Sequence, residues 1–296
     1  MAGSDLAGVV FTMMPQSTEL VERVNRLVPV VVIGDRNTSL NVDTVEMNSY
    51  SAGAIIAHYM IGLGHKHIAY ISTTLNEANS ARVRRLEGVR DTYRDECPEG
   101  SVIVRSREVT PKEERDNISI EHAVGFELTR KCLGERHITA FVAVNDMVAY
   151  GVLDAIRAEG RRVPEDYSVC GFDNIFPSQF LPVGLTTVEH YIADKGRNAF
   201  VILHSKMSGE SSDRNITRVE FKHHLIVRDS TAASRGEEKS GYGTDEWEDG
   251  TLPVRPSVSI RSFSDGAWLR PGPESSGNRD PHADYTWNIG QFCIAG

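Results

Sequence analysis

Short apolar runs alternate with segments of helical period from Ala7 to Asn174, and this alternation limits the possible folds more than any other feature of the chain. Such runs are typical of strands buried on both faces of a parallel sheet, and parallel strands need the crossovers that the helical segments supply. The predicted strands are AGVVF (Ala7–Phe11), VPVVVIG (Val28–Gly34), HIAYIS (His67–Ser72), AFVAVN (Ala140–Asn145) and YSVCGF (Tyr167–Phe172). Strand, helix, strand in repetition predicts an α/β fold with doubly wound parallel sheets.

Three segments beside these runs carry helix signals. STELVERVNRL begins with a Ser-Thr cap and repeats its apolar residues on one face. SAGAIIAHYMIGLGH is small and apolar on most sides and ends at Gly62 and Gly64, as a buried crossover helix would. DMVAYGVLDAIRAEG closes at Gly160. These helices complete the strand and helix alternation.

Composition narrows the class of protein. The chain has 296 residues, of which 40% are hydrophobic, so it can bury a substantial core. Its formal net charge of -9 gives it no general attraction for nucleic acid, so contact with DNA would have to come from another segment. No apolar run reaches the roughly 18 to 20 residues that cross a bilayer, and no signal peptide opens the chain. We therefore expect a cytoplasmic protein with no membrane contact.

Neither the cysteines nor the histidines predict a metal or a cofactor. Cysteines occur singly, without a C-x-x-C pair, which argues against a disulfide framework and a zinc knuckle and favours reduced thiols. They are Cys97, Cys132, Cys170 and Cys293. His65 and His67 have an H-x-H spacing that can hold a metal, but beside a helix-ending glycine they fit better as a helix cap and a strand entry.

The composition changes near residue 232. From there Gly, Ser, Pro and charged residues dominate without a period, apart from the short alternation SVSIRSF. All three tryptophans, Trp247, Trp268 and Trp287, lie in this part. We interpret residues 1–231 as the folded domain and residues 232–296 as a disordered or unrelated tail.

Polar residues follow two of the apolar runs directly. Asn145 comes after one run and Asp173 after another, and in open parallel sheets ligands bind beyond the carboxyl ends of the strands. An amide both donates and accepts, a carboxylate accepts from hydroxyl groups, and Arg85, after the strand HIAYIS, can supply a planar fork of donors. Together these residues predict a site for a small polar molecule.

Each of these residues also has a purely structural interpretation. Asn145 can cap the helix that follows it, Asp173 can begin a turn, and Arg85 can belong to a solvated helix face with Arg82 and Arg84. The sequence alone leaves these alternatives open.

In their order, the segments resemble the effector-binding domain of the LacI/GalR (lactose-repressor) family of bacterial transcription regulators. The segments that carry the resemblance are VVVIGDRN, VDTVEMNSYSAGAIIAHYMIGLGHKHIAYIS, RLEGVRDTY, AFVAVNDMVAYGVLDAIRAEGRRVPEDYSVCGFDN, LTTVEH and LIVRDST, which cover Ala7 to about Thr231. The resemblance implies a periplasmic-binding-protein-like fold of type I with two lobes, a sugar or purine-like effector between the lobes, and a homodimer.

The resemblance also implies roles for individual residues. At the matching positions, Arg85 grips the ligand, and Asn145 and Asp173 form hydrogen bonds with it. Less specific matches place three further residues along the cleft, namely Thr12, Ser51 and His190. Phe172 and Tyr50 are candidate stacking platforms for a planar base, and each fits equally well as a core residue.

Two departures from the family pattern stand out. The N-terminal helix-turn-helix with its T-x-x-D-V-A opening is absent, so DNA would be reached only through a missing headpiece. The chain also starts at what looks like the third strand of the first lobe, so that we expect an incomplete lobe. The missing central strand would leave the apolar edge of Ala7–Phe11 bare. These departures suggest a gene fragment or a misassigned start.

Two other classes of protein are considered. A periplasmic solute-binding protein shares the fold, but it would need an export signal and would not be expected to end in VRDST. An enzyme is disfavoured because no G-x-S-x-G, H-E-x-x-H or phosphate-binding glycine loop is found, which leaves only Asp35 and Asp173 as an acid and base pair. The sensor domain of a regulator is the leading hypothesis.

Overall fold

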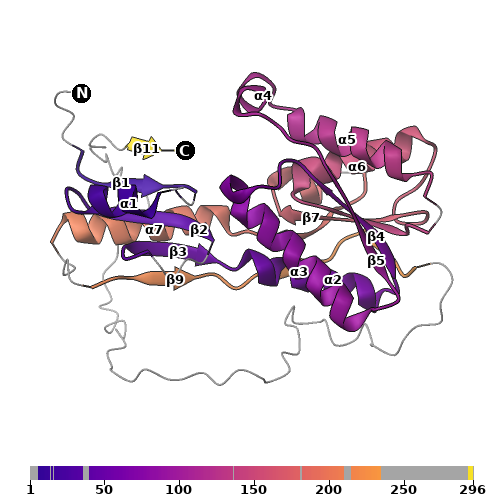
Figure 1. Ribbon diagram of the computed structural model, residues 1–296, viewed down its shortest axis with the longest axis horizontal. Helices are drawn as coiled ribbons and strands as arrows, with labels where there is room; N and C mark the ends of the chain where they lie inside the picture. The colour runs from indigo at the N-terminus through magenta and orange to yellow at the C-terminus, as the bar shows by residue number, and fades with distance from the viewer. Residues whose placement is uncertain are drawn as a thin grey trace, which may run out of the picture.

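A computed structural model describes residues 6–13, 15, 17–35, 40–135, 137–180, 182–209, 215–234 and 293–295 of the chain. Its strands form one five-stranded sheet and one six-stranded sheet. Figure 1 shows the two sheets at opposite ends of the long axis, each with helices of its own, so the protein has two lobes. The predicted α/β fold with parallel sheets is confirmed.

The first lobe is built on the five-stranded sheet, with strand order β11-β1-β2-β3-β9 and parallel pairing throughout. Its strands are β1 (Val9–Phe11), β2 (Val30–Asp35), β3 (Asp43–Met47), β9 (Arg218–Glu220) and β11 (Cys293–Ala295). Successive residues of a strand face opposite sides. Val30 and Val32 therefore pack with Val21 of α1 (Thr18–Asn25), while Val31 packs with Leu203 of α7 (Ile192–Met207).

The outer edge of β1, which the resemblance predicts to be bare, is paired. Strand β11 runs parallel to it, with Val9 opposite Cys293 and Phe11 opposite Ala295. The prediction of a bare edge is therefore wrong at these residues, because an unpaired strand edge offers backbone donors and acceptors to any nearby strand. The three tryptophans and the segment SVSIRSF lie outside the described ranges.

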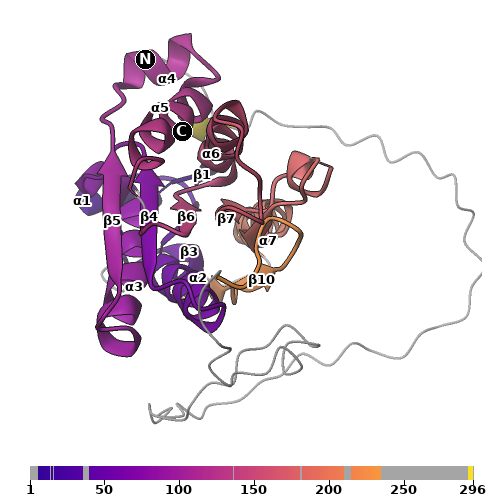
Figure 2. The ribbon, with the colours of Figure 1, turned by 90° about the vertical axis from the view of Figure 1, so that its right-hand side faces the viewer.

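The second lobe is built on the six-stranded sheet, with order β10-β8-β7-β6-β4-β5 and a single antiparallel pair, β10 with β8. Its strands are β4 (His67–Ser72), β5 (Ser101–Ser106), β6 (Ala140–Ala143), β7 (Ser168–Asp173), β8 (Thr186–Glu189) and β10 (His224–Ile226). Its helices are α2 (Ser49–Gly62), α3 (Ser80–Glu96), α4 (Pro111–Asp116), α5 (Ile120–Cys132) and α6 (Asp146–Ala158), with short 3-10 turns η1 (Glu77–Asn79) and η2 (Phe176–Gln179). Figure 2 shows the sheet between α2 and α3 on one face and α5 and α6 on the other.

Glycines let the helices of the second lobe approach closely. A Cβ atom on Gly53 of α2 would lie 2.0 Å from the carbonyl oxygen of Arg85 in α3, and one on Gly88 would lie 2.1 Å from that of Tyr50. Gly125 and Gly151 make the same reciprocal contact between α5 and α6. The position of Arg85 thus depends on a glycine in the neighbouring helix.

The chain passes between the lobes three times between residues 40 and 234. The crossings run from β3 into α2, from β8 into α7 and from β9 into β10. The first contains Asn48, the second contains His190 and Tyr191, and the third contains His223. Tyr191 adopts a left-handed conformation with φ of 49°. These crossings bring the two sheets together along one seam.

Candidate ligand-binding site between the lobes

Strand ends from both lobes meet at the seam. Met47 ends β3 in the first lobe, Asp173 ends β7 in the second, and His190 directly follows β8. The imidazole of His190 contacts both other residues, through Nε2 to the sulfur of Met47 and through Nδ1 at 3.6 Å to Oδ1 of Asp173. Ligands of parallel α/β sheets bind at such carboxyl ends.

Met47, Asp173 and His190 form a cluster at the seam. Arg85, which the sequence predicts as a ligand-binding residue, is a cation of this cluster. Only 7% of its surface is exposed, and Nη1 donates to the carbonyl oxygen of Val144 over 2.8 Å. Its Nη2 lies 3.7 Å from Oδ1 of Asp173, and its guanidinium lies over the ring of Phe172 at 5.0 Å from the centroid. Arg85 is therefore buried against the ends of β6 and β7, and the interpretation as a solvated face fails for this residue.

Asp173 stands at a strained turn. It has φ of 108° and the next residue, Asn174, has φ of 50°, both in the region that L-residues seldom adopt. Asn174 holds the turn, donating to Glu189 Oε2 over 2.6 Å and accepting from Arg228 Nη2 over 2.7 Å. Burial raises the pKa of Asp173 to about 6, against the opposing charge of Arg85. Asp173 thus begins a turn and also carries a carboxylate into the cluster.

Asn145 lies at the end of β6 with both of its amide atoms engaged. Oδ1 accepts from the backbone N–H of Val148 over 2.9 Å and so caps α6, as the structural alternative predicts. Nδ2 donates to Glu121 Oε2 over 2.9 Å, and Glu121 in turn forms an ion pair with Arg82 at 3.0 Å. A ligand would reach this amide only by exchanging one of these bonds.

The two other predicted cleft residues lie apart from these contacts. Thr12 is exposed just beyond β1, and Ser51 is half-buried in the first turn of α2, where its N–H donates to Asn48. The contacts that gather Arg85, Asp173 and His190 include neither of them.

Two residues of the cluster have no counterpart in the sequence predictions. Lys195 of α7 is 3% exposed, and its Nζ lies 3.8 Å from the sulfur of Met47. Burial lowers its pKa to about 8, with Asp173 opposing, so the side chain is still a cation at pH 7. Nε2 of His223 is buried without a hydrogen-bond partner. A lysine on the helix stripe that also buries Ala199 is the signal that could have found this part of the site.

Asp146 holds the turn at Asp173 and Asn174 in place through hydrogen bonds to the residues around it. Its carboxylate accepts from the hydroxyl groups of Ser178 and Thr187, over 2.5 and 2.6 Å, and from the N–H of Ile175 over 3.0 Å. Burial raises its pKa to about 7. Because Ile175 lies two residues after Asp173, these bonds position the carboxylate of the cluster.

Both candidate stacking platforms are engaged within the protein. Phe172 is 2% exposed and lies beneath Arg85. Tyr50 donates to Asp91 over 3.1 Å, and the guanidinium of Arg84 covers one face of its ring at 5.6 Å. Neither ring is therefore a ready platform for a planar base.

The histidines and cysteines have structural surroundings. His65 bonds to the hydroxyl groups of Thr139 and Ser168 and to the carbonyl oxygen of Ala232, each over 2.9 Å, and so ties residues beyond the predicted boundary at 231 to the second lobe. His67 bonds to Ser101 over 3.0 Å. Among the residues that the structure describes, no group of three or more metal-binding side chains is arranged to hold an ion. Three buried cysteines form no disulfide, namely Cys97, Cys132 and Cys170.

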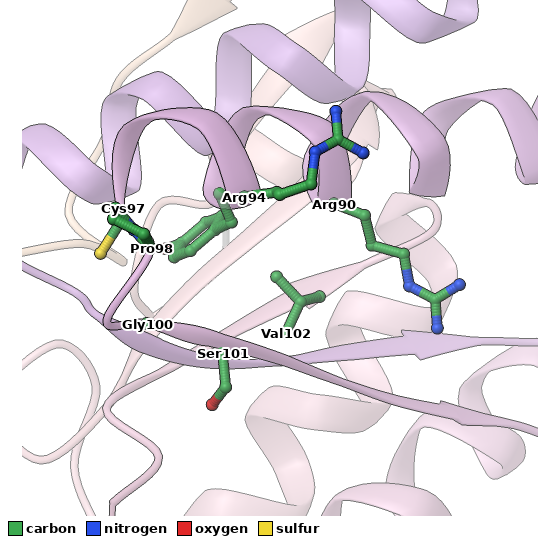
Figure 3. Close-up of a pocket in the computed structure, with 8 residues that line it drawn as sticks. Arg90, Arg94, Cys97, Pro98, Gly100, Ser101 and Val102 are labelled. Atoms are coloured by element: carbon green, nitrogen blue, oxygen red, sulfur yellow. The ribbon is translucent and has the colours of Figure 1, made fainter.

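A separate hollow of about 350 Å³ lies between the end of α3 and the start of β5. Its lining includes Arg90, Arg94, Cys97 and Ser101, and Figure 3 shows the two guanidinium groups spread apart from each other. Arg94 is ion-paired with Asp91 at 2.6 Å. This hollow lies at the amino edge of the sheet, away from the strand ends that carry the cluster.

In the described parts of the chain, none of the helices has the length and apolarity needed to span a membrane.

Comparisons with known proteins agree with this geometry. The model of the periplasmic binding protein-like domain matches residues 57–231. The HTH-type transcriptional repressor PurR of Histophilus somni is 30% identical over 203 residues, which are 68% of this chain and 57% of that repressor. PurR of Haemophilus influenzae is 29% identical over 205 residues, with 69% and 57% covered. The chain thus spans just over half the length of these relatives.

Solved structures show the same fold. A LacI family transcriptional regulator from Enterococcus faecium, with bound ribose, has a TM-score of 0.64 and 20% identity, covering 77% of this chain and 80% of that one. The complex of the transcriptional regulator CelR with cellobiose has a TM-score of 0.61 and 24% identity, covering 77% and 67%.

Two lobes of parallel strands, three crossings and a polar cluster at the seam define a periplasmic-binding-protein-like domain. The predicted resemblance is confirmed. The chain belongs to the LacI family of transcriptional regulators, whose effector-binding domain it carries.

Proposed function

We propose that this chain is the cytoplasmic sensor of a transcriptional regulator and that it binds a small polar effector between its lobes. The observation that carries the proposal is the buried guanidinium of Arg85 beside the carboxylate of Asp173, at the seam where strand ends from both lobes meet. A donor fork and an acceptor side by side match a molecule with neighbouring hydroxyl groups.

A sugar fits this site better than a purine-like base. Relatives of the same fold were solved with ribose and with cellobiose. Phe172 and Tyr50, the rings that could have stacked on a base, are engaged by arginines. In the proposed complex Arg85 donates to the sugar, Asp173 and Asn145 accept or donate hydrogen bonds, and His190 lies against it. Thr12 and Ser51 line the outer parts of the same cleft.

The proposed output is a change in the orientation of the lobes. A ligand that contacts both lobes favours the closed arrangement by the difference between its affinities for the closed and open states. In a homodimer joined along both lobes, closure would move two DNA-binding headpieces that belong to a complete regulator. No catalytic step is part of this function, since binding alone shifts the equilibrium.

The test is ligand-induced thermal stabilisation of the purified chain. D-ribose, D-glucose, cellobiose and hypoxanthine are added separately, and a ligand at about 100 times its Kd should add about 2.7 kcal/mol to the free energy of unfolding. We expect at least one sugar to raise the melting temperature, and Arg85→Ala and Asp173→Ala to abolish the rise. Arg94→Ala removes an exposed arginine from the far end of the same helix and should keep it. An equal rise in all variants, or no rise with any of the four compounds, would contradict the proposal.

A further inference from the structure

The ammonium group of Lys195 is buried at the seam without a carboxylate of its own. It is 3% exposed, no ion pair within 4.0 Å joins it among the described residues, and its one hydrogen-bond contact is the weak acceptor Sδ of Met47. Buried charges in proteins are normally paired, since an isolated charge is expensive to remove from water. The buried ammonium group of Lys195 is therefore unusual unless a bound molecule supplies the negative charge.

The same helix contains a buried lysine of the ordinary kind. The side chain of Lys206, with 7% exposure, lies 3.5 Å from the carboxylate of Asp43 and donates to the carbonyl oxygen of Asn215. Both lysines are on α7, but among the residues that the structure describes an anionic partner within 4.0 Å is found for Lys206 and not for Lys195. For Lys206 the counter-ion thus comes from β3, while Lys195 has no such partner among the described residues.

The two carboxylates whose charge acts on Lys195, those of Asp173 and Glu189, have other partners. Asp173 lies beside Arg85 at 3.7 Å. Glu189 accepts from Asn174 over 2.6 Å and from the N–H of Tyr191 over 2.7 Å. Asp173 and Glu189 both hold the pKa of Lys195 up, yet burial outweighs them and the pKa falls. Neither carboxylate therefore forms an ion pair with the ammonium group of Lys195.

A second polar atom at the seam also lacks a partner. Nε2 of His223 is buried and unbonded. Burial lowers the pKa of this histidine, and the charges of Arg85 and Lys195 lower it further, so these side chains belong to one cluster. Backbone oxygens of Glu189 and Asn48 accept from this ring. A neutral imidazole carries one proton, so Nε2 is left as an acceptor. A cation without a carboxylate partner among the described residues and an imidazole nitrogen without a hydrogen bond thus lie in the cluster that contains Arg85 and Asp173.

We propose that the effector is a hydroxylated molecule with an anionic group, a carboxylate or a phosphate, which pairs with Lys195, while a hydroxyl group of the same molecule donates to Nε2 of His223. This inference rests on the proposed function and names the class of effector. Other hydroxyl groups of the effector form hydrogen bonds with Arg85 and Asp173, as in the proposed sugar complex. Arg85 is less suited to the anion, because Val144 and Asp173 already engage its fork.

The experiment measures Kd by calorimetry for two matched sets of probes. One set is D-ribose, D-ribonate and D-ribose 5-phosphate, and the other is D-glucose, D-gluconate and D-glucose 6-phosphate. Each set is measured with the wild type, with Lys195→Met and with Lys131→Met. Methionine is unbranched and only one heavy atom shorter than lysine, and it removes the charge. Lys131 lies on an exposed helix face paired with Glu127, so its variant has the same change in net charge away from the seam.

We expect a charged member of one set to bind at least about tenfold tighter than its neutral parent, a difference of about 1.4 kcal/mol. In Lys195→Met this preference should disappear, so that the charged member binds no more tightly than its neutral parent measured with the same variant. Lys131→Met should behave like the wild type. The melting temperature of each variant without ligand shows whether it is folded.

Three outcomes overturn the inference. If the neutral parents bind as tightly as the charged members, the effector is uncharged, and the proposed function stands alone. If Lys195→Met keeps the preference, the anion binds elsewhere. If none of the six probes binds the folded wild type, the proposed sugar-binding function fails together with the inference. The carboxylate and phosphate members separate the two sources of anionic charge.

Discussion

Arg85 and Asp173 come from different strand and helix units, yet the guanidinium of Arg85 lies 3.7 Å from the carboxylate of Asp173 at the seam between the lobes. Arg85 is fixed by its bond to Val144 and by Phe172 beneath it, while Asp173 is fixed by the turn that Asp146 holds. Each side chain is therefore oriented before a ligand arrives, which lowers the entropic cost of binding.

Sugar affinity should fall as the pH falls through about 6. Burial raises the pKa of Asp173 to about 6, and a protonated carboxyl loses its charge and part of its capacity to accept from hydroxyl groups. At pH 5 about a tenth of the carboxyl remains ionised, so Kd for a neutral sugar should rise about tenfold between pH 7.5 and pH 5. Calorimetry at three pH values measures this. In Asp173→Asn, binding should be weak and independent of pH, and a wild-type Kd that stays constant would show that Asp173 is not the acceptor.

Gly53→Ala should weaken both the fold and the site. The added Cβ would lie 2.0 Å from the carbonyl oxygen of Arg85, so α3 must move away from α2. Overpacking of this kind lowers the free energy of unfolding by about 1 to 3 kcal/mol, and the displacement of Arg85 should remove the sugar-induced thermal shift. Urea denaturation and the thermal shift assay measure the two effects.

Gly62→Ala is the matched control for this change. Gly62 belongs to the same helix, and a Cβ there would meet nothing within 4 Å. The control should keep the sugar response and lose no stability. If both alanine variants behave alike, the close approach of α2 and α3 does not position Arg85.

Residue patterns predicted the strands that are continuous apolar runs, such as β4, β6 and β7, because these are buried on both faces and contain no acidic residue and no Lys or Arg before Asp173 at the end of β7. Strand β3 was not predicted, since its sequence DTVEM contains two acids. Asp43 and Glu46 are nevertheless buried, and Lys206 and Arg218 from distant segments supply their counter-ions. A local residue pattern does not predict such a strand, because the ion pairs that allow its acids to be buried involve residues far away in the sequence.

Some residues of the candidate site could be predicted from local sequence patterns, and others could not. Arg85 and Asp173 were predictable because each follows an apolar run of the second lobe. In parallel sheets ligands bind beyond the carboxyl ends of the strands, where such residues lie. Lys195 was not, because α7 leaves the second lobe and packs on the first, so its neighbour Met47 comes from a strand that the pattern missed. The crossings between lobes, rather than local periodicity, decide which side chains share the seam.

Acid should destabilise the chain through His65. Burial lowers the pKa of His65 to about 4 from the ordinary value of 6.5. A histidine with a lowered folded-state pKa contributes stability above pH 6.5, and this contribution is lost as the pH falls toward 4 because only the unfolded state takes up the proton. The loss should reach about 3 kcal/mol at pH 4.

His65→Gln tests this directly, because glutamine keeps an amide that can bond to Thr139 or Ser168 and has no group that titrates in this range. Urea denaturation at pH 7 and at pH 4.5 gives the free energies. The wild type should lose about 2 to 3 kcal/mol more than the variant between these values. An equal loss in both proteins would mean that His65 takes up its proton in the folded state.

The two buried lysines of α7 should respond in opposite directions to the same substitution. Lys206→Met leaves the carboxylate of Asp43 buried without its cation, so the free energy of unfolding should fall by about 2 to 4 kcal/mol. Lys195→Met removes an ammonium that has no carboxylate partner in the described part of the chain and places an apolar chain beside Met47, so the free energy of unfolding should rise by roughly 1 kcal/mol in the absence of ligand. Urea denaturation of both variants at pH 7 without added ligand decides the matter. If Lys195→Met is destabilised as strongly as Lys206→Met, Lys195 already has its counter-ion within the chain, and no anionic ligand is needed to explain the burial of its charge.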